Sequence, residues 1–429
     1  EFLAKSPDSS QASLSTVAGY QNLLDNEWLT VSVSPGIEFL CTDDYVFDRN
    51  RVKPEIWGLY TWNPILYQAT DVTENSWEKP YRAINFANDA LAHLPKLPAS
   101  ELAKTDDYSW AYGTALFLRA FHYFFLEETF GQPYDPNTAT SAKGVVLRLG
   151  IDPEDRPDRS SVAEVYDLIM HDLTAAVRYL PRVVQHEHIN RPTLPAAYAM
   201  LARACLVRQD FHAAQVYADS CLTLTDSLLR YDEVSTANSK LFDGFNNPEL
   251  LFQCSGLDLA PVFPNFATVD STLYDSYDSN DLRRSLFFQP SAKGPGVIFW
   301  GFYSTGRLLF SGLAVDEAFL VRAECKARNK DIQGAMGDLN KLLATRWRPG
   351  TYHDYQAATP EMALDIVLRE RRKELVGREL RFSDLRRLMN EPFALTIRRA
   401  TGEHLQPGDS GWTLPIPALE ISRGGVTQN

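Results

Sequence analysis

The chain has 429 residues, of which 45% are apolar and 23% are charged. This composition allows a large hydrophobic core and excludes an intrinsically disordered protein. The formal net charge is −13, whereas a protein that binds nucleic acid needs an excess of lysine and arginine to displace counterions from the phosphates. We therefore expect no nucleic-acid partner.

The first third of the chain combines helical segments with one long irregular stretch. A helix is expected from about residue 10 to residue 28. Residues 34–76 then lose helical periodicity, and prolines interrupt a run that is rich in tryptophan and tyrosine. Loops of this length are uncommon unless they serve a function. Further helices are predicted at 77–94 and 107–130, where His122 lies on an apolar stripe and is interpreted as a packed core residue.

A capping box marks the start of the next helix, which is predicted to run to Pro181. In Ser161-Val-Ala-Glu164 the serine oxygen can accept from the Glu164 amide while the Glu164 carboxylate reaches back to the Ser161 amide.

Two segments have the pattern of a tetratricopeptide hairpin, in which two short antiparallel helices meet at a tight turn. In residues 198–222, apolar and small side chains recur every three and four positions on both sides of Asp210. Residues 318–343 repeat the pattern, and Asp331 then corresponds to Asp210. The two turns are 121 residues apart, so we expect a helical array that is interrupted by residues 230–311.

The interrupting segment is rich in glycine, proline and aromatic residues. Short strands are predicted at Leu250–Cys254 and Val297–Tyr303, without a regular sheet. A later helix is expected to start at Thr359-Pro360, where an N-cap precedes a proline in the first helical position. The expected architecture is one mainly α domain over residues 1–429, with loop-rich parts at 34–76 and 230–311. Its helical scaffold is assigned to residues 77–131, 161–226, 313–345 and 360–390.

Motifs of common catalytic and metal sites are missing from the sequence. There is no nucleotide-binding loop, GxSxG elbow, HExxH or EF-hand loop, and the five cysteines form no CxxC pair. The His-Glu-His run at 186–188 lacks a third metal ligand, and the aspartates of residues 275–281 lack the glycine and the distal glutamate of a calcium loop. We assign no metal and no cofactor, and no carboxylate pair can be selected for a glycosidase.

Residues 369–388, RERRKELVGRELRFSDLRRL, are the most charged stretch of the chain. Its arginines could bind phosphate, but four acidic residues lie among them at helical spacing, namely Glu370, Glu374, Glu379 and Asp384. We therefore interpret the stretch as a network of ion pairs that fixes this helix against its neighbours.

The aromatic loops are the strongest candidate for a binding site. The apolar C–H face of a sugar stacks on an aromatic ring, while Asp, Asn and Arg bind its hydroxyl groups. One ring that covers about 80 Å² contributes about 2 kcal/mol, so two or three rings give micromolar to millimolar binding. The alternative is that these rings form small cores inside the loops. The stacking candidates are Trp57, Trp62 and Trp300, with Tyr60, Tyr274, Tyr277 and Tyr303 beside them, and the polar candidates are Asp71, Asn280 and Arg283.

Several stretches together resemble the SusD/RagB family of outer-membrane nutrient-binding lipoproteins. They are FLRAFHYFFLEETFG (117–131), the two hairpins, residues 369–388, and the closing LPIPALEI (414–421) with TQN at the end. The opening EFLAKSPDSS resembles the mature N-terminus of the family just after its lipidated cysteine, and we expect a mature chain from which the targeting signal has been removed.

The resemblance implies a SusD-like fold in which tetratricopeptide units face a SusC-like TonB-dependent transporter and a loop-rich part carries the ligand. It implies a non-catalytic protein, lipid-anchored at the cell surface of the outer membrane, that captures an oligosaccharide or polysaccharide and delivers it to the transporter. Two other functions stay open. One is a peptide-binding or protein-interaction scaffold whose aromatics serve packing, and the other, with less support, is a glycoside hydrolase.

Overall fold

The structure, a computed structural model, describes residues 14–152, 154–235, 242, 247–256, 266–303 and 308–429. The EFLAKSPDSS opening and the first residues of the helix predicted at 10–28 lie outside the described residues. So does part of the aromatic segment 230–311, including Phe245 and Phe263.

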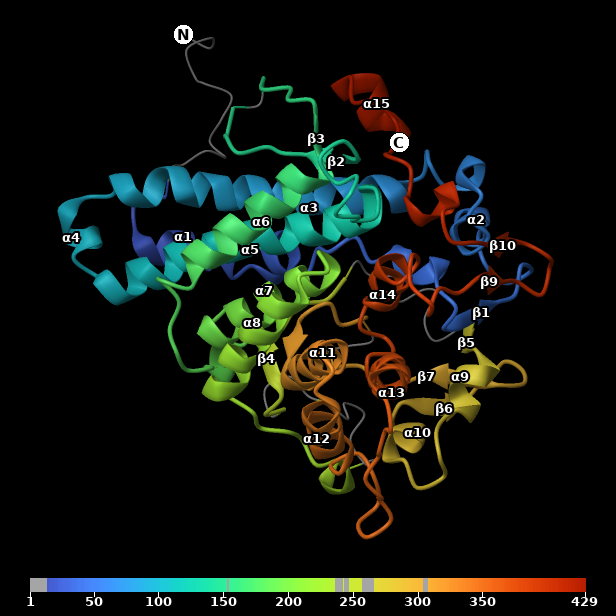
Figure 1. Ribbon diagram of the computed structural model, residues 1–429. Coiled ribbons are helices and arrows are strands. Elements are labelled where there is room, and N and C mark those ends of the chain that lie inside the picture. Colours follow the sequence, from blue (N-terminus) through green and yellow to red (C-terminus); the bar gives the residue numbers. More distant parts are fainter. Residues whose placement is uncertain (1–13, 153, 236–241, 243–246, 257–265, 304–307) are drawn as a thin grey trace.

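The chain folds mainly into helices, and its short strands are paired in twos (Figure 1). The helices are α1 (Val17–Leu24), α2 (Pro54–Tyr60), α3 (Asp71–His93), α4 (Ala99–Leu102), α5 (Thr105–Phe130), α6 (Val162–Ala176), α7 (Leu194–Val207), α8 (Phe211–Leu224), α9 (Ser271–Asp275), α10 (Leu282–Leu286), α11 (Val315–Arg328), α12 (Ile332–Leu343), α13 (Pro360–Glu374), α14 (Arg381–Arg387) and α15 (Ala418–Gly424). The antiparallel strand pairs are β1 (Tyr45–Phe47) with β5 (Ala267–Val269), β2 (Lys143–Val146) with β3 (Arg159–Ser161), β4 (Leu250–Phe252) with β8 (Leu313–Ala314), β6 (Phe288–Pro290) with β7 (Val297–Phe299), and β9 (Ile397–Arg398) with β10 (His404–Leu405).

The long helices α3, α5 and α6 pack side by side and bury much of the main core. The helix α3 begins at Asp71, before the expected start at residue 77, because Asp71 and Glu74 in its first turn interact favourably with the positive end of the helix dipole. His122 on α5 is buried, with its Nε2 2.6 Å from the Thr30 carbonyl oxygen. Burial lowers the pKa of His122 to about 4, so the predicted core histidine is confirmed and is neutral.

The capping box predicted at the start of α6 is confirmed. The Ser161 hydroxyl accepts from the Glu164 amide at 3.3 Å, and the Glu164 carboxylate accepts from the Ser161 amide at 2.7 Å. These two bonds satisfy donors at the helix start that would otherwise have no partner.

The two predicted hairpins are α7–α8 and α11–α12, and their turns have the same construction. Gln209 and Lys330 have φ values of 61° and 65°, so each chain reverses through one left-handed residue. Asp210 and Asp331 then cap the second helix, because each side chain accepts from the amide three residues later. The predicted correspondence of Asp331 with Asp210 is therefore confirmed.

The interruption between the hairpins exists in the sequence and not in space. Helix α8 of the first hairpin packs directly against α11 of the second, and Figure 1 shows α7, α8, α11 and α12 in succession. The contact consists largely of small side chains, which allow close approach of the helices. They form one buried cluster of Ala202, Cys205, Leu206, Ala214, Ala218, Val321 and Cys325.

Residues 34–76 are not one continuous loop, because they contain β1 and α2. The helix α2 has only seven residues, too few for its periodicity to be recognised in the sequence. The strands β4 and β7 lie within the two predicted strand segments and are shorter than expected.

The ion-pair network predicted for residues 369–388 is confirmed. Its arginines reach acidic side chains of α11, of α14 and of the chain just before β1, so it fixes α13 and α14 against several neighbours. Arg369 is exposed, and Arg386 donates to the Gly131 carbonyl oxygen instead. Glu379 is bound by the Ser34 hydroxyl. The pairs are Arg371–Asp384, Arg372–Asp44, Arg378–Asp316, Arg381–Asp43 and Arg387–Glu324, with N–O distances of 2.6–2.9 Å.

The most deeply buried part of this network involves two arginines that lie outside 369–388. The Arg283 side chain has no exposed surface and contacts the carboxylates of Asp281, Glu370 and Glu374 at 2.7, 2.6 and 2.9 Å. Glu374 also pairs with Arg346 at 2.7 Å. The network therefore ties α10, inside the interrupting segment, to α13.

We predict that the loss of the Arg283 charge is strongly destabilising. Arg283→Met keeps the side-chain volume but removes the central cation of three buried carboxylates, which are then left with only Lys373 and Arg346, and we expect the free energy of unfolding to fall by about 3–5 kcal/mol. The control is Arg369→Met, whose exposed i,i+4 pair with Asp365 is worth at most about 0.5 kcal/mol. Urea unfolding followed by circular dichroism measures both. Equal effects of the two changes would contradict the assigned role of Arg283.

A second prediction concerns pH. Burial raises the pKa of Glu127 on α5 to about 8, and its Oε2 accepts from the Val145 amide at 2.9 Å. Because the folded pKa lies above the unfolded value of 4.5, the stabilisation is complete below about pH 4.5 and is lost as the pH rises through about 8. Glu127→Gln keeps the acceptor without the titration. We expect the loss of stability between about pH 5 and pH 8 to be smaller in this variant by roughly 1–3 kcal/mol. Glu154→Gln, at an exposed position, should reproduce the wild-type profile in pH-dependent urea unfolding.

Candidate functional site

The two loop-rich parts of the chain meet in the folded protein. Strand β1 of the first part pairs with β5 of the second, with Tyr45 opposite Val269 (Figure 1, right side). Near this ladder the Arg51 guanidinium donates to the Lys293 carbonyl oxygen at 2.8 Å. The two parts are therefore joined by main-chain pairing and by side chains, which include the Ser34 hydroxyl donating to the Ser311 hydroxyl at 2.9 Å.

The first group of predicted residues lies on and after α2. Trp57 and Tyr60 are buried against each other, with ring centroids 5.4 Å apart. Trp62 is only half-buried, and its indole nitrogen donates to the Cys41 carbonyl oxygen at 3.1 Å. Trp62 is thus the ring of this group that a ligand can reach.

The position of Trp62 depends on an arginine that no sequence pattern indicated. The Arg399 guanidinium lies 4.3 Å from the Trp62 ring centroid and 3.8 Å from that of Tyr60, and it donates to the Tyr60 carbonyl oxygen at 2.8 Å. The Trp62 backbone has a φ of 54°, a left-handed conformation that is uncommon for a residue other than glycine. The half-exposed ring is therefore held in place by a cation on one side and by its own backbone.

The second group of predicted residues lies around α9, α10 and β7, and part of it is inaccessible. Tyr277 and Tyr303 are buried, and their hydroxyls bond to the Lys373 carbonyl oxygen and to Glu249 at 2.8 and 3.1 Å. Arg283 is buried in the ion network described above. These residues, like Trp57 and Tyr60, therefore serve the packing of this structure and offer no surface to a sugar.

Five of the predicted residues remain accessible. Tyr274 is half-buried with the Arg284 guanidinium 4.5 Å from its ring centroid, and Trp300, which follows β7, is also half-buried. Asn280 is half-buried, and Asp71 is exposed in the first turn of α3. Together with Trp62, we call these residues the accessible loop residues.

The acidic run near α9 is used for ion pairing. Asp281 is buried and contacts Arg283, with Lys373 at 3.5 Å. Among the residues that the structure describes, no group of three or more His, Cys, Asp and Glu side chains could hold a metal ion. Within the same residues, every helix is too short or too polar to cross a bilayer.

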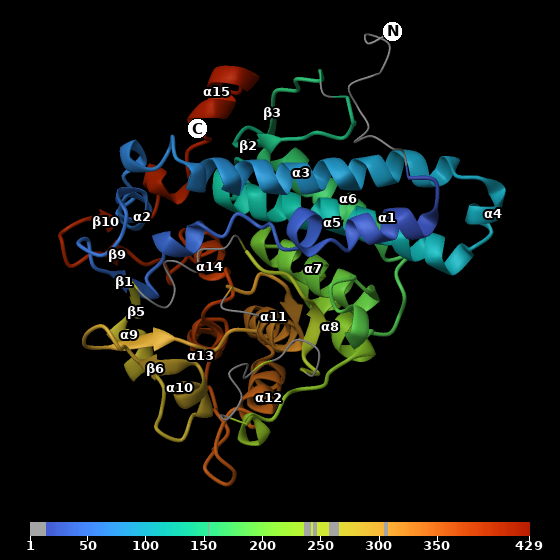
Figure 2. The same cartoon turned by 180° about the vertical axis from the view of Figure 1, so that it is seen from behind.

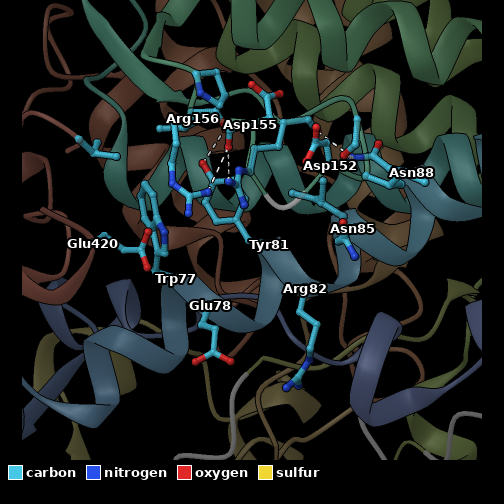
Figure 3. Close-up of a pocket in the computed structure, with 17 residues that line it drawn as sticks. Trp77, Glu78, Tyr81, Arg82, Asn85, Asn88, Asp152, Asp155, Arg156 and Glu420 are labelled. Atoms are coloured by element: carbon cyan, nitrogen blue, oxygen red, sulfur yellow. Dashed lines mark hydrogen bonds between the residues drawn. The ribbon is translucent and has the colours of Figure 1, made fainter. Parts of the chain in front are cut away.

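A cavity of about 580 Å³ lies beside α3, in a place to which no sequence pattern pointed (Figure 3). Its lining comes from α3, from the chain that follows β2, and from the C-terminal residues around α15. Because these three segments are far apart in the sequence, only the fold brings them together. The lining includes Trp77, Tyr81, Asn85, Asp152, Arg156 and Glu420.

Comparison with protein families gives two matches that cover both ends of the chain. Residues 1–206 match a family described as starch-binding and associating with the outer membrane, and residues 316–429 match the SusD family. No curated protein gives a significant match.

Several solved structures from Bacteroides species resemble the protein over nearly its whole length. A SusD superfamily protein from Bacteroides thetaiotaomicron has a TM-score of 0.80 and 22% identity, covering 96% of this chain and 99% of its own. A putative sugar binding protein from Bacteroides vulgatus has a TM-score of 0.79 and 19% identity, with coverages of 98% and 99%. Surface glycan-binding protein A from Bacteroides uniformis has a TM-score of 0.77 and 17% identity, with coverages of 96% and 98%.

These structural similarities establish the fold, and the two family matches establish the family. The chain belongs to the SusD/RagB-like family and has its mainly α, SusD-like fold.

Proposed function

We propose that the protein is a non-catalytic carbohydrate-binding protein of the cell surface that captures an oligosaccharide. The observation that carries this proposal is the half-exposed Trp62 ring, which Arg399 and a left-handed backbone hold in a fixed position. A ring that is fixed before the ligand arrives loses little conformational entropy on binding. The family description, starch-binding and associating with the outer membrane, and the names of two structural relatives as sugar- or glycan-binding proteins support the same class of ligand.

The accessible loop residues are the proposed contacts. Trp62, Tyr274 and Trp300 provide rings on which the apolar face of a sugar can stack. The carboxylate of Asp71 and the amide of Asn280 can bind hydroxyl groups, as acceptor and as donor plus acceptor. A small number of such contacts gives micromolar to millimolar affinity, which suits a protein that releases its ligand to a partner.

The proposed partner is a SusC-like TonB-dependent transporter in the outer membrane, to which an N-terminal lipid would keep the protein close. The hairpins α7–α8 and α11–α12 form a continuous helical frame that is separate in sequence from the loop-rich parts. This frame is the proposed contact with the transporter. Recovery of the transporter barrel with an affinity-tagged form of the protein from solubilised outer membranes tests the pairing, and copurification that survives mutation of the loops is expected.

We predict that removal of a single accessible ring weakens glycan binding. Trp62→Ala deletes about 80 Å² of stacking surface, so the Kd should rise roughly thirtyfold, which corresponds to about 2 kcal/mol. The measurement is isothermal titration calorimetry against a panel of soluble oligosaccharides, first with the wild type to find the ligand. Tyr274→Ala and Trp300→Ala should each weaken binding of the same ligand.

The matched control is Trp28→Ala, since the Trp28 side chain is 62% exposed but lies outside the loop-rich parts. This variant should bind with wild-type affinity. Normal binding by all three ring variants would show that the site is elsewhere. Release of reducing ends during prolonged incubation with the bound glycan would favour a hydrolase instead.

A further inference from the structure

The lining of the cavity beside α3 contains none of the accessible loop residues, although Asp71 begins the same helix. Figures 1 and 2, which are opposite views, both place β2, β3 and α15 next to α3, while β5 and β6 lie at another edge of the molecule. Its volume of about 580 Å³ is within the range of roughly 300–1,000 Å³ that is usual for small-molecule sites. The cavity is thus large enough for a ligand of its own.

Hydrogen bonds hold one wall of the cavity in place. The Tyr81 hydroxyl donates to the Val146 carbonyl oxygen at 2.7 Å, and the Asn88 amide donates to the Arg148 carbonyl oxygen at 2.9 Å. Tyr123 on α5 donates to the same Arg148 oxygen at 2.9 Å and accepts from the Arg148 amide at 2.7 Å. Residues 146–148 are therefore fixed against α3 and α5 by three side chains, which hold this part of the cavity wall in place.

The charges of the lining narrow the class of ligand. Arg148 and Arg156 lie among three acidic residues, namely Asp152, Asp155 and Glu420, while Glu78 and Arg82 line the outer side of α3. A phosphate or sulfate would be repelled by the carboxylates, and a purely apolar ligand would take water from these charges without replacing its hydrogen bonds. A neutral molecule with many hydroxyl groups can bind the carboxylates and the guanidinium groups together, because a hydroxyl can donate to a carboxylate and accept from a guanidinium.

The arrangement of the side chains gives such a ligand contacts at both ends. In Figure 3, Trp77, Arg156 and Glu420 lie together at one end, and Asn85, Asn88 and Asp152 lie at the other. Glu78 and Arg82 project from α3 away from the loop. The donors of Asn88 are already used by the Arg148 and Gly150 carbonyl oxygens. Asp152 Oδ1 accepts from the Glu154 amide and Arg156 Nη1 donates to the Asp155 carbonyl oxygen, but a carboxylate has two oxygens and a guanidinium five N–H donors, so Asn85, Asp152, Arg156 and Glu420 are the groups suited to bind hydroxyls.

We propose that this cavity is a second carbohydrate site, which binds a short stretch of a neutral glycan. The class of ligand, a carbohydrate, follows from the proposed function. The place of binding follows from the cavity alone. Two sites on one chain raise the effective concentration of a long glycan at each of them, so a polysaccharide is retained more tightly than a short fragment. The cavity site would hold the chain while the accessible loop residues bind and release another part of it.

Hydrogen–deuterium exchange with defined hexasaccharides tests this proposal. The probes are maltohexaose, cellohexaose, xylohexaose and mannohexaose, each at millimolar concentration and each added to the full chain. We expect at least one probe to slow exchange of the amides in residues 77–88 and 146–157, and to do so in Trp62→Ala as well. In the double variant Asp152→Ala/Arg156→Ala, both of whose positions are at the surface, this protection should require at least tenfold more probe. Lys79→Ala, on α3 but outside the lining, is the matched control and should behave as the wild type.

The outcomes separate this proposal from the proposed function. Protection of residues 45–62 alone would overturn the second site and leave the accessible loop residues as the binding site. Protection of 77–88 that survives in the double variant would show that the assigned residues are wrong. Absence of protection in 77–88 and 146–157 with all four probes rejects the cavity as a site for neutral glycans.

Discussion

A charge that is removed from water must be matched inside the protein, and this constraint at Arg283 links the main parts of the structure. Three carboxylates surround its guanidinium, one from its own loop and two from α13, and Glu374 continues the contact to Arg346. Arg346 in turn pairs with Glu249 at 2.8 Å. Each of these charges would be costly alone, so the segments that carry them must dock together or not at all. The network therefore determines where the interrupting segment sits on the helical frame.

The frame itself does not need that segment to be continuous. The helices α8 and α11 meet through alanine and cysteine side chains, and each hairpin turns through one left-handed residue followed by an aspartate cap. The turns depend only on residues within each hairpin, and the helix contacts depend only on residues of the two hairpins. A long insertion between α8 and α11 can consequently differ in length and composition without loss of the frame. Because the hairpins contact each other without residues of the insertion and buried ion pairs attach the insertion to α13, loops of variable sequence can still have a fixed position.

The features that the sequence predicts well are those with a local period or a fixed spacing. The helices, the Ser161 capping box, the paired hairpin turns and the ion pairs of residues 369–388 follow from such patterns. Which of the predicted site residues are accessible does not follow, because tryptophan, tyrosine and arginine are equally suited to binding sites and to buried clusters. Tyr277, Tyr303 and Arg283 are buried by partners from distant segments. The contact of Arg399 with Trp62 joins positions more than three hundred residues apart and has no sequence signal. The cavity beside α3 likewise has no sequence signal, because its lining comes from segments that are far apart in the sequence.

The two proposed sites differ in what holds them. Trp62 depends on Arg399, near the C-terminal end of the chain, and on a strained backbone, so its position reflects the docking of loops. The cavity wall is bonded to α3 and α5, the long helices that build the core, through the hydroxyls of Tyr81 and Tyr123 and the amide of Asn88. Changes in the loop-rich parts or near Arg399 can therefore alter the first site while the second keeps its shape. A protein built in this way could change its ligand specificity through its loops and keep a general hold on neutral glycans through its frame.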